Sequence, residues 1–287
     1  MEKVVLAGAY GKLGSEILKV LVERGYDVVA ADVIDREVEG VDKSAYAYRK
    51  LDATDAASLE GLCDGADVVI TTVGLTTASA KVTAYDIDYH GNLNILNEAK
   101  RAGVKKFVYI SVIKADKAPD TVPMVHAKAL MEADLKKSGI DYVIHRPTGY
   151  FYDIVKVFKP MIESGSVSLL GNEAVHANVV DCPEFAAFIV DHMHDTNVTY
   201  NVGGKETWSY EEIARMCFDA AGKPAVIKRA PAFLFDVLAW LPKNKKNGKS
   251  AIIRFSKWTL TEEMVGDTHV GEHSFKDYIY ESFKKEA

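Results

Sequence analysis

Cysteine is scarce in this chain of 287 residues. The three cysteines, Cys63, Cys182 and Cys217, lie far apart and form no Cys-x-x-Cys pair. Zinc knuckles and disulfide frameworks both need paired or closely spaced cysteines, so the sequence argues against either. Free cysteines are typical of a reducing compartment, and we expect a cytoplasmic protein.

Long apolar runs and an excess of basic residues are also missing. The apolar run at residues 4–9 is too short for the core of a signal peptide, and the run at 232–241 is interrupted by Asp236. A membrane span needs about 20 apolar residues. The chain carries 35 basic and 41 acidic residues, a net charge of −6, whereas nucleic-acid binding needs a basic surface. We therefore expect neither a membrane nor a nucleic acid as partner.

The first half of the chain alternates between two patterns. Short β-branched runs are followed by stretches with apolar residues at helical spacing. Strands connected by helices pair in parallel, and nearly continuous apolar strands are typical of a sheet covered on both faces. The sequence predicts an α/β fold with a doubly wound parallel sheet, with strands at 4–7, 27–31, 45–49, 67–72, 106–110 and 141–145 and helices at 12–24, 56–62, 84–102 and 122–137.

A glycine-rich turn joins the first predicted strand to the first predicted helix. It reads Gly8-Ala9-Tyr10-Gly11-Lys12-Leu13-Gly14. Gly8 allows a tight turn, Gly11 allows the backbone to approach a pyrophosphate, and Gly14 allows the helix to pack on the strand. The helix N-terminus then offers unpaired N–H groups to the anion. This context indicates a dinucleotide site, although a tight turn without a ligand gives the same pattern.

Acidic residues follow the second and third predicted strands. Asp32 is placed to accept hydrogen bonds from the adenosine ribose and to repel a 2′-phosphate, which favours NAD(H) over NADP(H). The alternative is an aspartate that caps a helix or simply lies in a loop. Asp52, followed by Ala53, is placed to reach the adenine, because Thr54 or Asp55 fits a helix N-cap better. After the fourth strand, Thr72-Val73-Gly74 again places a glycine where backbone meets ligand.

The pattern becomes less regular after Pro147. We expect residues 1–147 to form a Rossmann dinucleotide-binding domain and residues 148–287 to form mainly a substrate-binding lobe, with some segments returning to the sheet. His192 and His194 on one helix point in nearly opposite directions, so no metal site is expected. Aromatic residues gather in the second part, where they form either an apolar pocket wall or ordinary core: Tyr150, Phe151, Tyr152, Phe158, Phe233, Phe235, Trp240 and Trp258.

These features together resemble the short-chain dehydrogenase/reductase superfamily. More narrowly, the chain resembles its extended and atypical members: the NmrA-like, isoflavone-reductase-like and divinyl-chlorophyllide-reductase-like proteins. The resemblance covers nearly the whole chain and is specific for the superfamily but not for a substrate. It rests on the glycine turn, Asp52, Lys128 with Glu132, and the segments 89–92 (YHGN), 104–111 (VKKFVYIS), 138–142 (SGIDY), 146–151 (RPTGYF), 200–204 (YNVGG) and 260–265 (LTEEMV).

The resemblance implies a set of catalytic residues. The superfamily uses a serine together with Tyr-x-x-x-Lys on one helix, where the ammonium lowers the pKa of the tyrosine so that the phenol exchanges a proton. By this resemblance Ser111 is the serine, and Lys128 is the lysine that also binds the nicotinamide ribose. Met124 occupies the tyrosine position, and a thioether cannot exchange a catalytic proton.

Three residues are considered as substitutes for the missing tyrosine. His126 lies two residues from Lys128 and is poorly placed, on nearly the opposite face of the helix. Tyr150 or Tyr152, after the sixth strand, can approach the nicotinamide from another side. The Tyr-x-x-x-Lys at 152–156 follows that strand and is interpreted as chance or as a substrate-loop helix. By resemblance to isoflavone reductases, Lys128 is either a proton donor or a cation that only anchors cofactor and substrate.

The sequence thus supports three functional hypotheses. The first is an NAD(H)-dependent reductase of a medium-sized apolar carbonyl or activated alkene. The backbone of Pro147, Thr148 and Gly149 would cradle the nicotinamide, and a substrate cleft would be lined by Met124, His126, Tyr150, Tyr152 and His176. The second is a non-catalytic NAD-binding redox sensor or scaffold of the NmrA type. The third is an epimerase or hydroxysteroid-type dehydrogenase, against which Met124 counts. Many relatives dimerise through a helix pair, so a homodimer is an open expectation.

Overall fold

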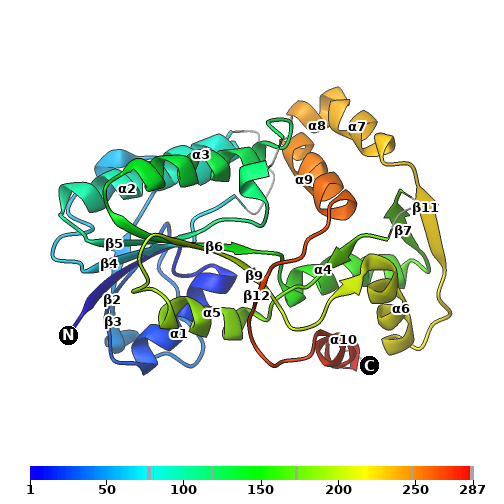
Figure 1. The fold of residues 1–287 in the computed structure, drawn as a ribbon, viewed down its shortest axis with the longest axis horizontal. Helices are drawn as coiled ribbons and strands as arrows, with labels where there is room; N and C mark the ends of the chain where they lie inside the picture. The colour runs from blue at the N-terminus through cyan, green and yellow to red at the C-terminus, as the bar shows by residue number, and fades with distance from the viewer. Residues whose placement is uncertain (76–78, 80, 118, 172–173, 247, 285–287) are drawn as a thin grey trace.

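An eight-stranded sheet forms the centre of the protein (Figure 1). The structure is a computed structural model and describes residues 1–75, 79, 81–117, 119–171, 174–246 and 248–284. Every neighbouring pair of strands in the sheet is parallel, which confirms the predicted α/β doubly wound fold. In spatial order the strands are β12 (Thr268–His269), β9 (Val198–Gly203), β6 (Asp141–Pro147), β5 (Lys106–Ile110), β4 (Val68–Thr71), β1 (Lys3–Ala7), β2 (Asp27–Asp32) and β3 (Tyr46–Lys50).

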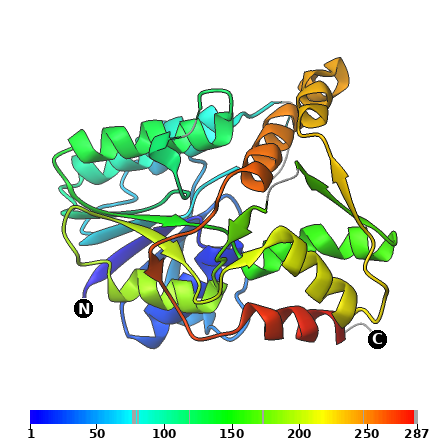
Figure 2. The ribbon, with the colours of Figure 1, turned by 45° about the vertical axis from the view of Figure 1, so that its right-hand side comes forward.

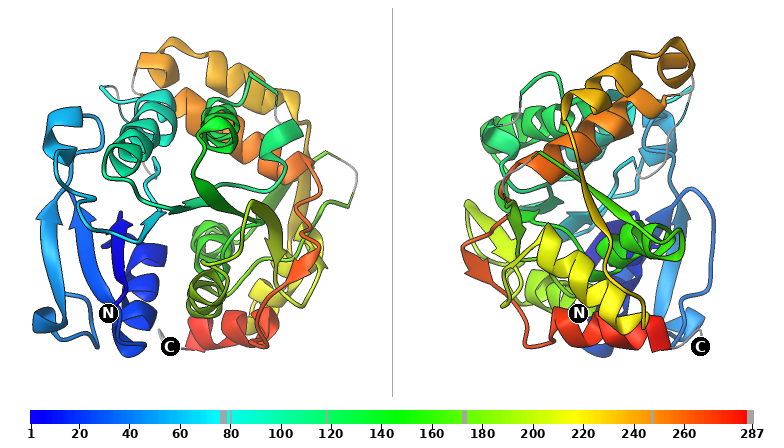
Figure 3. Two further views of the ribbon diagram at one scale, coloured as in Figure 1. Left: turned by 60° about the vertical axis from the view of Figure 1, so that its left-hand side comes forward. Right: turned by 90° about the vertical axis from the view of Figure 1, so that its right-hand side faces the viewer.

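Helices cover both faces of this sheet, above and below it in Figure 1 and at left in Figure 3. Helices α1 (Lys12–Glu23) and α5 (Cys182–Asp191) pack together against alternate strand residues such as Val4 and Leu6. On the other face, α2 (Asn92–Arg101) and α3 (Pro123–Lys137) cover Val5 and Ala7. Successive strand residues point to opposite faces, so burial of both faces explains the continuous apolar runs.

Two predicted helices differ from the structure. Of the helix expected at 56–62, only the short 3-10 helix η2 (Ala56–Leu59) forms. The helix expected at 84–102 is divided into the π-helix η3 (Tyr85–Gly91) and α2. Single π-helical turns are frequently found at functional sites. The remaining short helices are η1 (Lys43–Ala45) and η4 (Ala115–Lys117).

The segments after residue 147 build a second packed region beside the sheet (Figure 2). Its core joins α4 (Phe151–Glu163), α6 (Tyr210–Ala220) and α10 (Phe275–Lys284), while α5, β9 and β12 belong to the sheet region. The other elements are β7 (Val167–Leu170), β8 (His176–Ala177), β10 (Trp208–Ser209), β11 (Ile227–Ala230), α7 (Phe233–Trp240), α8 (Pro242–Lys246) and α9 (Lys249–Thr261).

The aromatic residues of this region differ in burial. Phe158 and Trp258 are buried in the second core, as ordinary core residues. Phe233 and Trp240 on α7 are 60% and 64% exposed, so the expectation that they line a pocket or a core is wrong. Among the described residues, no helix combines the length and apolarity that crossing a membrane requires.

Candidate functional site

The glycine turn is formed by closely packed backbone. Gly8 has a φ of +79°, and a Cβ there would lie 2.6 Å from Oγ1 of Thr72. A Cβ on Gly14 would collide with the carbonyl oxygen of Gly8. The Thr72 hydroxyl donates to that same carbonyl over 2.9 Å. Glycine is therefore required at both positions by the shape of the turn.

The N-terminus of α1 is left open for an anion. Gly11 is its N-cap residue, no side chain caps the helix, and its first turn contains no acidic residue. A Cβ on Gly11 would have only the Gly8 carbonyl, at 3.4 Å, within 4 Å. The N–H groups of the first turn and the positive end of the helix dipole fit a diphosphate. Lys12 is exposed beside this end, whereas Leu13 is buried against the sheet.

Asp32 at the end of β2 is fixed next to the turn. Its two carboxylate oxygens accept hydrogen bonds from the backbone N–H groups of Tyr10, over 2.9 Å, and Val33, over 2.7 Å. Beside it Tyr10 donates its hydroxyl to Asp35, and Lys43 also contacts Asp35. The sequence did not indicate this second group, because Tyr10 and Asp35 lie on loops and Lys43 begins the short 3-10 helix η1.

Asp52 is engaged locally. Its Oδ1 accepts from the backbone N–H of Thr54 over 3.0 Å and from the Thr54 hydroxyl over 2.7 Å. Asp55 caps η2 through the N–H of Ala57, as expected for a helix start at this point. The carbonyl of Ala53 accepts from Asn94. The Asp52 carboxylate thus forms a turn with Thr54, and an adenine contact at Asp52 would have to use its remaining acceptor sites.

Residues after β4 connect the turn to η3. The Asn92 side chain accepts from Thr71 and donates to the carbonyl of Val73 over 3.0 Å. Asn92 is fully buried, so its side chain makes these hydrogen bonds out of contact with solvent. A Cβ on Gly74 would lie 3.0 Å from Asp88 Oδ1 and 3.5 Å from Lys128 Nζ. Gly74 therefore allows the chain to pass directly over these two charged groups.

Lys128 forms an ion pair that sequence reasoning missed. Its Nζ lies 3.1 Å from Oδ1 of Asp88, whose side chain is 2% exposed, and 3.2 Å from the carbonyl of Ile110. The other Asp88 oxygen accepts from the N–H of Leu75 over 3.1 Å. Burial raises the pKa of the Asp88 carboxyl, and the Lys128 charge partly offsets that rise. The Lys128 side chain remains 18% exposed, so it is not fully enclosed.

Ser111 is held in a separate buried network. Its hydroxyl donates to Oε1 of Glu132 over 2.6 Å, and Arg146 grips the same carboxylate with contacts of 2.9 and 2.5 Å. Both charged side chains are less than a tenth exposed. The salt bridge to Glu132 and Asp116 raises the pKa of Arg146 against the effect of burial. The Ser111 hydroxyl thus donates its hydrogen bond to Glu132 and does not donate it to a substrate.

Met124 and His126 lie half-buried in the first turns of α3. Nδ1 of His126 is 2.9 Å from the hydroxyl of Tyr85 on η3. Lys128 contacts η3 as well, through Asp88. Tyr85 was not identified from the sequence. The structure therefore brings His126 and Lys128 to the same neighbouring helix, where their partners Tyr85 and Asp88 are three residues apart.

Tyr150 and Tyr152 lie on the other face of the sheet. Their rings stack at 5.4 Å and pack against the core formed with α1 and α5, whereas Lys128 comes from α3. Burial raises the pKa of both phenols. The Lys12 ammonium lies 6.0 Å from the Tyr152 ring. The structure thus brings these tyrosines to the α1 side and does not bring them to Lys128.

The segment after β6 is tied to the second region. Pro147 ends β6, Thr148 donates its hydroxyl to the carbonyl of Asn178 over 2.8 Å, and Gly149 has a φ of +138°. His176 lies on β8 with its Nδ1 3.1 Å from Glu263. His176 therefore belongs to a small antiparallel pair in the second region and is not grouped with Lys128.

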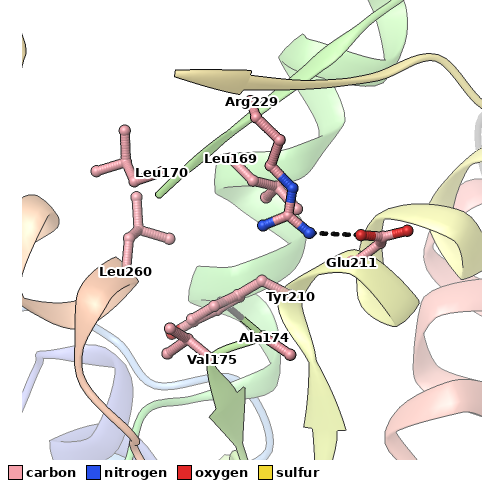
Figure 4. Close-up of a pocket in the computed structure, with 8 residues that line it drawn as sticks. All are labelled: Leu169, Leu170, Ala174, Val175, Tyr210, Glu211, Arg229 and Leu260. Atoms are coloured by element: carbon pink, nitrogen blue, oxygen red, sulfur yellow. Dashed lines mark hydrogen bonds and ion pairs between the residues drawn. The ribbon is translucent and has the colours of Figure 1, made fainter. Parts of the chain in front are cut away.

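Two hollows in the protein lie away from the glycine turn and from Lys128. One, of about 10 Å³, is enclosed by apolar side chains and by Arg229, whose guanidinium points to Glu211 (Figure 4). That is room for about one water molecule. The other, of about 170 Å³, opens beside Arg146 and Asn201. Neither is lined by the glycine turn or by Lys128. No group of three potential metal ligands occurs in the described part of the chain.

Comparison with known proteins agrees with this geometry. A family model described as NAD(P)H-binding matches residues 8–196. The photosystem II assembly factor Ycf39 of Synechocystis is 26% identical over 238 residues, 80% of this chain and 71% of that protein. The divinyl chlorophyllide a 8-vinyl-reductase of Arabidopsis thaliana is 26% identical over 218 residues, 68% of this chain and 50% of that protein.

A solved structure shares the fold. Triphenylmethane reductase of Citrobacter superposes with a TM-score of 0.75 at 19% identity, covering 99% of this chain and 100% of that one, and it has also been solved with NADP(H). The relatives confirm the resemblance to NAD(P)-binding proteins of the divinyl-chlorophyllide-reductase kind. Because the family model matches two thirds of the chain, including the glycine turn, strands β2 to β6 and α3, the chain belongs to the family of NAD(P)H-binding proteins.

Proposed function

We propose that the protein is an NADH-dependent reductase of a medium-sized apolar carbonyl or activated alkene. The observation that carries this proposal is the Lys128–Asp88 pair directly beneath Gly74, in which Asp88 is buried and Lys128 is partly exposed. It supplies a fixed proton-bearing group where Met124 replaces the usual phenol. The pair lies at the carboxyl edge of the parallel sheet, and open α/β folds bind their ligands at that edge.

The chain's own residues have defined tasks in this proposal. The first-turn N–H groups of α1 would bind the diphosphate, and Asp32 would accept from the adenosine ribose. The bound nicotinamide supplies a hydride. Lys128 holds a proton at Nζ for the atom that becomes negative, and Asp88 compensates the ammonium charge and orients it. The substrate would lie against Met124 and His126 at the start of α3.

The preference for NADH over NADPH rests on Asp32. A carboxylate fixed by two backbone N–H groups cannot turn away from a 2′-phosphate, and two like charges in contact repel each other. Lys43, which contacts the Tyr10 hydroxyl beside Asp32, is already paired with Asp35. The residues around Asp32 therefore favour a cofactor whose adenosine ribose carries free hydroxyls, as in NADH.

Single-turnover kinetics with bound NADH test the catalytic role. A panel of quinones, enones and aromatic aldehydes should reveal an accepted substrate. Lys128→Ala should then lower the rate of NADH oxidation by about 10² to 10⁴, the range typical of general acid catalysis, while NADH still binds. Lys137→Ala, an exposed lysine on the same helix, is the matched control and should leave the rate unchanged. An unchanged rate in Lys128→Ala would sink the proposal.

A redox sensor is the second candidate, and one observation favours it. The Ser111 hydroxyl donates to Glu132, and Met124 cannot exchange protons. Of the usual serine, tyrosine and lysine, only the lysine is therefore left for catalysis. A sensor would bind NADH tightly, oxidise it with none of the panel, and bind a partner with an affinity that depends on the nicotinamide redox state. Epimerase or alcohol dehydrogenase activity is disfavoured by Met124, and Met124→Tyr should be needed to create it.

A further inference from the structure

Helix α7 exposes a broad apolar face. At about 100° per residue its exposed apolar side chains fall within roughly 160° of the helix circumference. On the opposite side Ala239 is fully buried where α7 packs on α9. Exposed apolar patches of this kind mark interaction sites. The exposed residues and their exposed fractions are Phe233 60%, Leu234 42%, Val237 50%, Leu238 44%, Trp240 64% and Leu241 39%.

The segment that continues from this face carries only positive charge. Residues 237–261 contain six basic residues and no acidic one. The rest of the chain has 29 basic and 41 acidic residues, so it carries a net charge near −12 while this segment carries about +6. The one acidic residue of α7, Asp236, is paired with Lys257 of α9 over 2.6 Å. The charge of the segment is therefore opposite in sign to that of the molecule as a whole.

We propose that α7 and α8 dock on the surface of an anionic lipid bilayer. An apolar helix face bordered by lysines and containing tryptophan is the combination that binds in the membrane interface plane. Helix α7 has eight residues, far too few to cross, and lies along the surface. Lys243 and Lys249, which are both exposed, attract anionic headgroups. This proposal differs from the expectation of no membrane partner stated from the sequence.

The position of α7–α9 connects this surface to the candidate site. These helices form the upper right corner of the molecule in Figure 1, beyond the end of α3. Helix α9 packs on α3, and the backbone of Gly248 passes directly against that of Ser79 in the segment leading from Gly74 to η3. Docking through α7 would therefore hold the carboxyl edge of the sheet close to the bilayer.

Vesicle flotation of the full chain tests the proposal. Vesicles of phosphatidylcholine with about a third phosphatidylglycerol should bind the protein at low salt. Pure phosphatidylcholine vesicles should bind at least about tenfold less protein. Leu234→Asn with Leu238→Asn should lower the partition coefficient at least about tenfold. Lys243→Glu with Lys249→Glu should lower it by a similar factor, and high salt should mimic that loss.

Val157→Asn on α4 is the matched control, because Val157 is 49% exposed on a different surface and its loss should change nothing. Circular dichroism and NADH binding verify that each variant is folded. Failure of the wild-type chain to bind anionic vesicles, or equal binding by the Leu234/Leu238 variant, would overturn the proposal. Sedimentation showing that the same two leucines hold a dimer without any vesicle binding would also overturn it, in favour of a second copy on α7.

Discussion

The glycine turn and the start of α3 lie at the same edge of the sheet but are built on different principles. The turn is made of backbone: its shape follows from Gly8, Gly14 and Thr72, which are neighbours through β1 and β4. The α3 end is made of charged side chains buried in pairs, Lys128 with Asp88 and Arg146 with Glu132. A backbone site needs small residues, whereas a side-chain site needs every charge to have its partner.

The largest expected effect lies in the side-chain end. Glu132→Gln removes the buried carboxylate that pairs with Arg146 and leaves Arg146 only the exposed Asp116, so the free energy of unfolding should fall by about 3–5 kcal/mol in denaturant titrations. Lys136→Gln removes an exposed contact to the same carboxylate and should cost less than about 1 kcal/mol. Equal losses in the two variants would remove the distinction between buried and exposed pairs.

The stability of the protein should depend on pH through His145, a buried group that belongs neither to the glycine turn nor to the start of α3. Burial lowers the pKa of His145 to about 3, and neither ring nitrogen has a hydrogen-bond partner among the described residues. The unfolded chain binds a proton below pH 6.5 and the folded chain only near pH 3. The contribution is thus fully present above pH 6.5 and is lost at about 1.4 kcal/mol per pH unit as the pH falls.

His145→Phe tests this assignment. The ring fits among Phe185, Phe188 and Tyr200, so the variant should be at least as stable as wild type at pH 8. At pH 4.5 it should be more stable by a further ~3 kcal/mol, measured by chemical unfolding at both pH values. His90→Phe, at an exposed histidine, should show no such difference. A wild-type pH dependence in His145→Phe would contradict the assignment.

Asp88→Asn sharpens the contrast between the two ends. Loss of the buried charge should free Lys128 to move, and the rate of NADH oxidation should fall about 10- to 100-fold. NADH affinity should change by less than about threefold, because the glycine turn is untouched. Rates across pH 5–9 would show whether the variant's pH profile also shifts. A loss of cofactor affinity with an unchanged rate would place Asp88 in the cofactor site instead.

The smallest expected effect concerns cofactor choice. Asp32→Asn keeps an acceptor oxygen for the N–H of Tyr10 but removes the charge. The ratio of NADH to NADPH affinity should fall about tenfold in fluorescence titrations. Asp52→Asn provides the comparison, since its carboxylate is engaged with Thr54, and should leave the ratio unchanged. No change in Asp32→Asn would refute the ribose assignment.

The same contrast explains what the sequence could predict. Apolar runs place β1, β2, β4, β5 and β6 within one or two residues of their observed bounds, because burial on both faces requires such runs. The two-residue strands β8, β10 and β12 have no such signature, and their pairing depends on tertiary contacts. The π-helical η3 was read as ordinary helix because its apolar spacing does not distinguish the two.

At the site, the glycine turn was predictable because its requirements lie within seven consecutive residues. Asp88 was not, because its partner Lys128 is 40 residues away and an acidic residue in a helical stretch normally faces solvent. Ser111 illustrates the converse. Its position matched the family pattern, but the direction of its hydroxyl depends on Glu132.

Calorimetric titration of NADH into the wild-type chain and Gly14→Ala tests the central claim that bare backbone holds the dinucleotide. We expect saturable one-to-one binding to wild type and a loss of at least about tenfold in Gly14→Ala, because its Cβ meets the Gly8 carbonyl. Gly25→Ala, whose surroundings are open, should lose stability but retain binding. A folded wild-type chain that binds neither NADH nor NADPH, or a Gly14→Ala variant that binds as tightly as wild type, would contradict the claim.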